Sequence, residues 1–200
     1  MKPIRLGFLV SGRGSNMLAI MNACAAGRLA AEPVVMISNN ADAAALDIAK
    51  NRGIPAYHLS QTTHPDPGQL DKAITGVMKK YLVDLVVLAG YMKLVGSKLL
   101  EEYRNRVINI HPSLLPLHGG KGMYGINVHK AVIAAGEKQT GVTVHLINSK
   151  YDDGLILAQR KIDVATTDTA ESLATRVLGV EHELYVEVLQ DIISGKIVLP

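Results

Sequence analysis

The stretch IRLGFLVSGRGSNMLAIMNACAAG, residues 4–27, passes from an apolar run through a glycine-rich turn into a segment with helical spacing. Residues 4–10 form a short run rich in branched side chains, which is typical of a strand buried on both faces. Residues 16–27 repeat apolar side chains as a helix does, and Gly27 suits a C-terminal helix cap. A strand, a tight turn and a helix in this order predict the first unit of an α/β sheet.

The same alternation continues through the first half of the chain. Apolar runs typical of strands recur at residues 33–38, 54–59 and 84–89. Helix-like segments lie between them, at residues 41–53 and 68–82. Because strand, helix and strand repeat, we expect right-handed crossovers that build a parallel sheet. The predicted fold class is therefore α/β: a Rossmann-like, mostly parallel, twisted sheet with helices on both faces.

The second half of the chain is less regular but predicts further elements of the same sheet. The expected helices are 97–105, 127–136 and 169–193, and two expected strands are 141–148 and 155–164. Asp168 or Thr169 suits the N-cap of the last helix. No linker, repeat or low-complexity tract divides the chain, so we expect a single domain over residues 1–200.

Composition limits the kinds of partner that the protein can have. The chain has 200 residues, 48% of them hydrophobic, and a net charge of +3 from 21 basic and 18 acidic side chains. This balance argues against a nucleic-acid-binding protein. The apolar run 6–10 is too short for a signal peptide or a membrane span, and the lone Cys24 fits packing in a reducing compartment. We therefore expect a cytoplasmic protein that acts on small molecules, with no nucleic-acid or membrane partner.

A second stretch, VINIHPSLLP at residues 107–116, carries the clearest sign of chemistry. Val107 and Ile108 fit a buried strand, whereas Asn109 and His111 share one side of the extended chain. An amide and an imidazole on one side can polarise a carbonyl group, because both donate hydrogen bonds. A nearby carboxylate would orient the imidazole and favour its charged form.

Asp152 or Asp153, in the loop after a predicted strand, can supply this carboxylate. A purely structural role remains an alternative, in which Asn109 and His111 bond the backbone of the proline-rich turn. His111 and His145 with an aspartate match no standard zinc spacing, so we expect no metal.

Two further segments fall at expected carboxyl ends of strands, where ligands bind in sheets of this kind. In SGRGSN, residues 11–16, the glycines permit a tight turn, and Ser15 or Asn16 suits the helix N-cap. The helix amides would then bind one phosphate rather than a dinucleotide, because Met17 stands where a third glycine would be. A tight turn with a cap and no ligand is the alternative.

In the other segment, AGYMKLVG at residues 89–96, Gly90 permits close backbone approach. Met92, Leu94 and Val95 can form an apolar wall for a ligand. A strand that simply runs into a helix is equally compatible with this stretch.

Together these segments resemble the phosphoribosylglycinamide formyltransferases, a family of folate-dependent enzymes of purine biosynthesis. The likeness extends over nearly the whole chain and is most specific in NIHPSLLP, in register with LAGYM upstream and GVTVH and YDDG downstream. It implies the formyltransferase fold, with a phosphate-binding half at about 1–88 and a catalytic and folate-binding half at about 89–200. Asn109, His111 and Asp152 match the family's catalytic residues.

The resemblance also implies a set of binding residues. Those for the ribonucleotide substrate are Gly14, Ser15, Asn16, Gly90, Met92 and Glu181, with Glu181 at the glycinamide end. Those for the folate are Met92, Lys93, Leu94, Val95, Asn148, Ser149 and Tyr151.

The chain departs from the family pattern at several positions. Pro67 stands where many members have a phosphate-binding arginine, which His64 or Arg13 would have to replace. Leu178 stands where a glutamine is common, and the stretch 117–129 is longer than the usual loop.

The implied reaction transfers the formyl group of 10-formyltetrahydrofolate, the cosubstrate, to the amine of glycinamide ribonucleotide. Asn109 and protonated His111 would stabilise the oxyanion, while Asp152 would hold His111 charged and help to pass the proton. We expect a monomer or a weak homodimer.

Three alternatives to this activity stay open. Methionyl-tRNA formyltransferase shares the motif but has an additional C-terminal domain, which we do not expect because no basic extension follows. Formyltetrahydrofolate deformylase has an extra N-terminal domain, which we do not expect because the first strand begins at Ile4. A non-catalytic nucleotide-binding module is the third.

Overall fold

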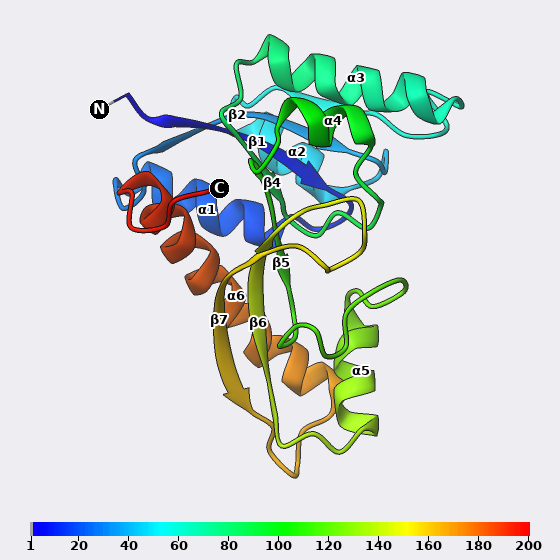
Figure 1. Ribbon diagram of the computed structural model, residues 1–200, viewed down its shortest axis with the longest axis vertical. Helices are drawn as coiled ribbons and strands as arrows, with labels where there is room; N and C mark the ends of the chain where they lie inside the picture. Colours follow the sequence, from blue (N-terminus) through cyan, green and yellow to red (C-terminus); the bar gives the residue numbers. More distant parts are fainter. Residues whose placement is uncertain (1) are drawn as a thin grey trace.

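The computed structural model describes residues 2–200, which form a seven-stranded sheet in the order β3-β2-β1-β4-β5-β6-β7 (Figure 1). The strands are β1 Ile4–Val10, β2 Ala31–Ser38, β3 Ala56–His58, β4 Leu85–Leu88, β5 Val107–His111, β6 Gln139–Leu146 and β7 Ile156–Asp163. Strands β1 to β5 pair in parallel, whereas β6 pairs antiparallel with both β5 and β7. The predicted α/β class with a mostly parallel sheet is confirmed.

Helices cover both faces of this sheet, as expected. They are α1 Ser15–Ala25, α2 Ala44–Asn51, α3 Pro67–Lys80, α4 Ser97–Glu102, α5 Ile126–Ala134 and α6 Ala170–Ile193. One core cluster joins the sheet to α1, α2, α5 and α6, and a second joins it to α3 and α4. In Figure 1, α6 runs diagonally across the molecule from α1 to α5, and it packs against both.

Alternation along the central strands divides their side chains between the two cores. On β5, Ile108 and Ile110 belong to the cluster under α6, whereas Val107 belongs to the cluster under α3 and α4. Since successive side chains of a strand point to opposite faces, Asn109 and His111 lie on the same face as Val107. The predicted shared orientation of the amide and the imidazole is confirmed.

Several predicted boundaries were wrong by a few residues. The expected strand 54–59 shortens to β3 because this edge strand pairs only with Met36–Ser38 of β2. The expected helix 97–105 ends at Glu102, since Asn105 has a positive φ of 57°. Strand β6 begins at Gln139 and ends at Leu146, two residues earlier at each end than expected.

The predicted cap of α1 was also wrong. Gly14, at φ 72°, is the N-cap residue, and the helix begins at Ser15 with no side-chain cap. The Asn16 amide instead donates to Glu181 across the molecule. A Cβ on Gly14 would lie 2.8 Å from the Ala45 Cβ, so only glycine fits this turn without displacement.

The N-terminus of α6 begins at the predicted cap. The Thr169 hydroxyl accepts from the Ser172 amide at 3.2 Å, and the Ser172 hydroxyl accepts from the Thr169 amide at 3.0 Å. We expect Thr169→Ala to lower the free energy of unfolding by about 1 kcal/mol, because the cap's acceptor is lost. Chemical denaturation measures this, with Thr167→Ala in the exposed preceding turn as the control. Equal losses in the two variants would contradict the capping role.

Candidate active site

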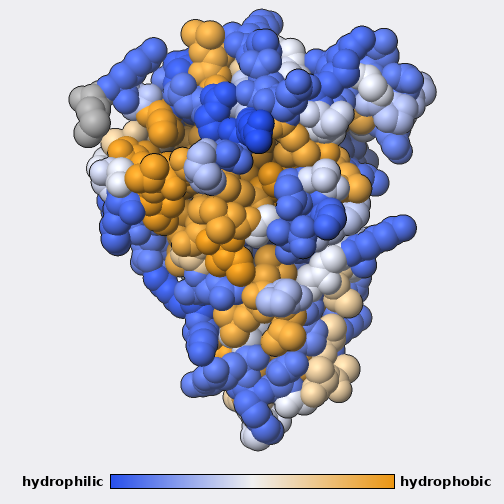
Figure 2. All heavy atoms as spheres, viewed as in Figure 1, coloured by the Kyte–Doolittle hydropathy of each residue, from blue (hydrophilic) through white to orange (hydrophobic). Residues whose placement is uncertain are grey.

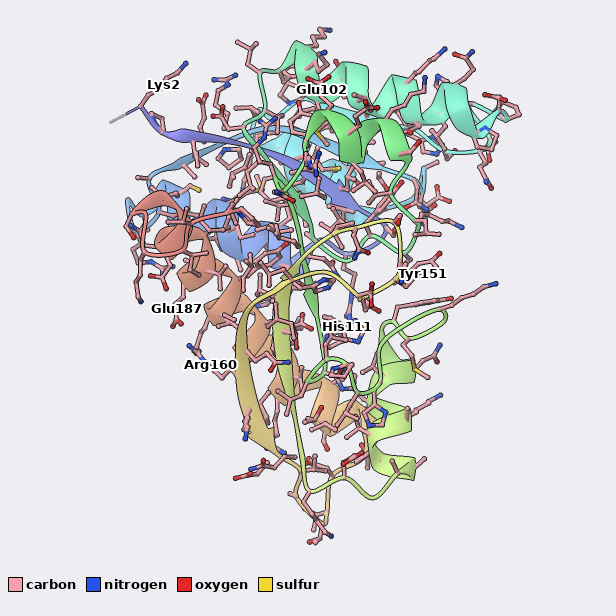
Figure 3. All side chains as sticks on the ribbon, viewed as in Figure 1. Lys2, Glu102, His111, Tyr151, Arg160 and Glu187 are labelled. Carbon is pink, nitrogen blue, oxygen red and sulfur yellow. The ribbon has the colours of Figure 1, made fainter. Side chains whose placement is uncertain are left out.

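A cavity of about 560 Å³ opens at the carboxyl ends of β1, β4 and β5. The strand order reverses between β1 and β4, the position at which open α/β sheets bind their ligands. The loops after β1, β4 and β6 and the glycine-rich segment before α5 line the cavity, together with α6. Figure 3 shows His111 at the end of β5 and Tyr151 in the loop that joins β6 to β7.

The structure brings nearly all of the predicted site residues to this cavity. Those that line it are Gly14, Ser15, Asn16, Gly90, Met92, Lys93, Leu94, Val95, Asn109, His111, Asn148, Tyr151, Asp152 and Glu181. Ser149 does not line it, although its neighbours on both sides do. The roles assigned to these residues stay predictions.

His111 and Asp152 face one another at the centre of the site. The His111 ring is buried, and its Nδ1 lies 3.6 Å from Asp152 Oδ1. Asp152 Oδ2 accepts a hydrogen bond of 2.8 Å from the Gly120 amide. The Asp152 side chain is only 12% exposed, so its charge acts on the imidazole with little screening by water.

Asp153, the alternative carboxylate, points elsewhere. Its side chain is 55% exposed and lies 3.7 Å from the Lys150 ammonium group. The geometry therefore favours Asp152 as the partner of His111.

Asn109 is held by a second histidine. The His145 Nδ1 lies 2.9 Å from the Leu146 carbonyl oxygen, which only accepts, so Nδ1 carries the ring hydrogen. Nε2 of the neutral ring then accepts from the Asn109 amide at 3.1 Å. Burial lowers the pKa of His145 and so favours this neutral form. The contact uses one N–H of Asn109 and leaves the other for a ligand.

A buried carboxyl group lies at the α6 side of the cavity. Glu181 Oε2 accepts a hydrogen bond of 2.8 Å from the Asn16 side chain. Burial raises the pKa of Glu181 to about 7, although the Asn16 hydrogen bond lowers it. The carboxyl group is thus partly protonated near neutral pH in the free protein, and a cationic or hydrogen-bonding ligand would shift that balance.

The raised pKa of Glu181 predicts how stability depends on pH. The folded state keeps a proton that the unfolded state releases between its ordinary pKa of 4.5 and about 7. The stability that this proton brings is complete below that window and is lost as the pH rises through it. Glu181→Gln removes this loss, so the free energy of unfolding of the variant minus that of the wild type should grow through the window.

Denaturant unfolding from about pH 4 to about pH 8 measures this difference in unfolding free energy. Subtracting the wild-type value at each pH cancels the contributions of the other titrating groups. Glu183→Gln, on the exposed side of α6, makes the same chemical change outside the cavity and is the control. A flat difference for Glu181→Gln would contradict the raised pKa.

Comparison with known proteins agrees with this fold. The family model described as formyl transferase matches residues 4–189. The chain belongs to the formyl transferase family.

Individual relatives extend the family match. The chloroplastic phosphoribosylglycinamide formyltransferase of Arabidopsis thaliana is 42% identical over 96% of this chain, which spans 66% of that protein's length. The phosphoribosylglycinamide formyltransferase of Haemophilus influenzae is 34% identical over 96% of this chain and 89% of its own. The structure of glycinamide ribonucleotide transformylase 1 from Symbiobacterium toebii has a TM-score of 0.92 and 37% identity, covering 100% of this chain and 92% of its own.

Cationic residues line the cavity of this formyl transferase. The position of Pro67, where many family members have an arginine, lies outside it. Pro67 is the first residue of α3 and does not line the cavity, nor does His64, which contacts Thr63. Arg13 does line it, directly before the Gly14 turn, and Lys121 lines it from the glycine-rich segment. Of the two predicted replacements for the phosphate-binding arginine, only Arg13 lines the cavity, and its role stays a prediction.

Two histidines at or beside the formyl transferase cavity were not among the predicted site residues. His129 on α5 is buried, lines the cavity, and has its pKa lowered by burial and then by His111. His145 was considered only as a metal ligand, whereas it holds Asn109. The alternation of GVTVH placed His145 on one face of a strand, but nothing in the sequence paired that strand with β5.

The mouth of the formyl transferase cavity is apolar. Met92, Leu94 and Tyr151 line the cavity and are 41–50% exposed, so they offer apolar surface to a ligand. Figure 2 shows hydrophobic residues gathered over the middle of the face that it draws, with hydrophilic residues around them.

Within residues 2–200, none of the helices combines the length and the hydropathy that crossing a membrane requires.

Proposed function

We propose that this formyl transferase moves the formyl group of 10-formyltetrahydrofolate to the primary amine of glycinamide ribonucleotide. The observation that carries the proposal is the convergence of Asn109, His111 and Asp152 in the cavity that also holds the α1 N-terminus. The names of the Arabidopsis thaliana and Haemophilus influenzae relatives support this choice of substrate.

The proposed reaction begins when the substrate amine attacks the formyl carbon. A new C–N bond forms, and the carbonyl electrons move onto oxygen as an oxyanion. The free N–H of Asn109 donates to this oxyanion, which develops only as the reaction proceeds, and the positive charge of the His111 imidazolium stabilises it.

Collapse of the oxyanion breaks the bond between the formyl carbon and the folate nitrogen. The proton lost by the attacking nitrogen passes through His111, Asp152 or a bound water to the departing nitrogen. The amine is already a nucleophile, so holding the two substrates together supplies much of the rate enhancement without a covalent enzyme intermediate.

The binding residues divide the cavity between the two substrates. The free amides at the N-terminus of α1, from Gly14 to Asn16, suit the ribonucleotide phosphate, with Arg13 beside them. Glu181 suits the amine end, since its carboxylate can accept N–H bonds. The apolar segment Met92–Val95 and the loop residues Asn148 and Tyr151 suit the folate ring.

The proposal is tested by mixing the purified protein with both substrates and following the release of tetrahydrofolate. Release that requires glycinamide ribonucleotide supports it. Release without any amine would indicate a deformylase, and release that requires methionyl-tRNA would indicate the tRNA-dependent enzyme. Ribonucleotide binding with no release at all would indicate a non-catalytic module. The cytoplasmic location and the monomeric or weakly dimeric state stay predictions.

A further inference from the structure

The loop after β5 contacts both His111 and Asp152 through its backbone. The His118 carbonyl oxygen lies 2.9 Å from His111 Nε2, and the Gly120 amide lies 2.8 Å from Asp152 Oδ2. A carbonyl oxygen only accepts, so Nε2 of His111 carries a hydrogen. Nδ1, which faces Asp152, is then the nitrogen at which the ring gains and loses its second proton.

The backbone of this loop has an uncommon conformation. His118 has a φ of 53°, in the left-handed region that few residues other than glycine adopt. Asp152 on the other side of His111 has a φ of 51°. Such conformations persist where the surroundings hold them, and they cluster at functional sites.

The His118 side chain supplies a contact that can hold this conformation. Its Nε2 lies 3.2 Å from Glu137 Oε1, in the turn after α5. The His118 ring is mostly buried and the Glu137 side chain is 34% exposed, so water screens the contact only in part. The adjacent Gly119 packs closely against its neighbours, because a Cβ there would lie 2.5 Å from Leu115 Cδ2.

We propose that His118 and Glu137 are a positioning pair for the reaction, an inference that rests on the proposed function. By holding the His118 carbonyl against His111 Nε2, the pair fixes the Nε2–H form of the ring and keeps Nδ1 as the proton-transfer nitrogen. Without the pair, the carbonyl moves away and the Asp152 carboxylate draws the single proton of the neutral ring to Nδ1. The ring then has no free Nδ1 to accept the proton of the attacking amine.

Two variants remove the pair in different ways. Glu137→Ala removes the acceptor, and His118→Asn keeps a residue that tolerates positive φ but is too short to reach Glu137. We expect each to lower kcat about tenfold, since small misplacements of a proton-transfer group are costly, with KM for the amine changed less than about twofold. Glu137→Gln keeps an acceptor oxygen and should retain most of the wild-type kcat. Glu102→Gln is the control, because Glu102 pairs with Lys79 far from the cavity and its side chain is 39% exposed, similar to Glu137. This variant should leave kcat unchanged.

The ¹⁵N chemical shifts of the His111 ring, assigned by their loss in His111→Gln, report which nitrogen carries the hydrogen in the neutral form. We expect Nε2–H in the wild type and a shift toward Nδ1–H in Glu137→Ala and His118→Asn. Unchanged kcat, or unchanged ring shifts, in both folded variants would overturn the proposal. Absence of formyl transfer in the wild type would instead overturn the proposed function, while the ring shifts would still decide whether the pair fixes His111.

Discussion

Asp152→Asn is expected to lower kcat by at least about 10²-fold while leaving the fold intact. The substitution preserves the shape of the side chain, and the remaining amide oxygen can still accept from the Gly120 amide. It removes the negative charge that lies 3.6 Å from His111 Nδ1 in a largely buried position. The His111 imidazolium then loses its counter-charge. Both the stabilisation of the oxyanion and the proton transfer depend on this imidazolium.

Steady-state kinetics at saturating levels of both substrates measure this effect. Asp153→Asn is the matched control: the same chemical change, one residue further along, at a side chain that is 55% exposed. It should retain nearly the wild-type kcat. High activity in Asp152→Asn together with low activity in Asp153→Asn would transfer the carboxylate role to the neighbouring residue.

Asn109→Ala is expected to lower kcat by about 10²–10³-fold, the usual cost of removing one oxyanion donor. The free N–H of Asn109 stabilises charge that appears only in the transition state, so KM for either substrate should change little. The variant also leaves His145 Nε2 without its partner at 3.1 Å, which adds a stability cost of about 1–3 kcal/mol.

Kinetics and thermal unfolding of the same sample separate these two effects. Asn51→Ala, at the exposed end of α2, removes an asparagine far from the cavity and serves as the control. A fall in kcat that merely parallels the loss of folded protein would argue against the oxyanion role.

Local signals in the sequence predicted much of the fold. Gly27 and Gly53 adopt the positive φ of helix ends, at 69° and 70°, and Thr169 caps α6 as expected. The period-two alternation of β5 placed Asn109 and His111 on one face, because that geometry depends on the strand alone. These features are set by neighbouring residues and need no knowledge of the tertiary structure.

Contacts between distant segments could not be derived in the same way. Asn16 suited a local cap, but its amide donates to Glu181 on the last helix, a competition that tertiary packing decides. Residue types alone did not choose between Asp152 and Asp153, whereas the folded loop brings Asp152 to 3.6 Å from His111 Nδ1 and leaves Asp153 beside Lys150. His118 gave no signal, because its role depends on its backbone carbonyl and on Glu137.

The proposed reaction joins a formyl carbon to a substrate amine in the cavity. The most direct measurement is ¹³C NMR of a reaction with ¹³C-formyl-labelled 10-formyltetrahydrofolate and ¹⁵N-amine-labelled glycinamide ribonucleotide. We predict a formyl signal split by one-bond coupling to ¹⁵N, formed by the wild type and greatly slowed in Asp152→Asn. A ¹³C signal that appears only as free formate, with no ¹⁵N coupling, would contradict the proposed reaction.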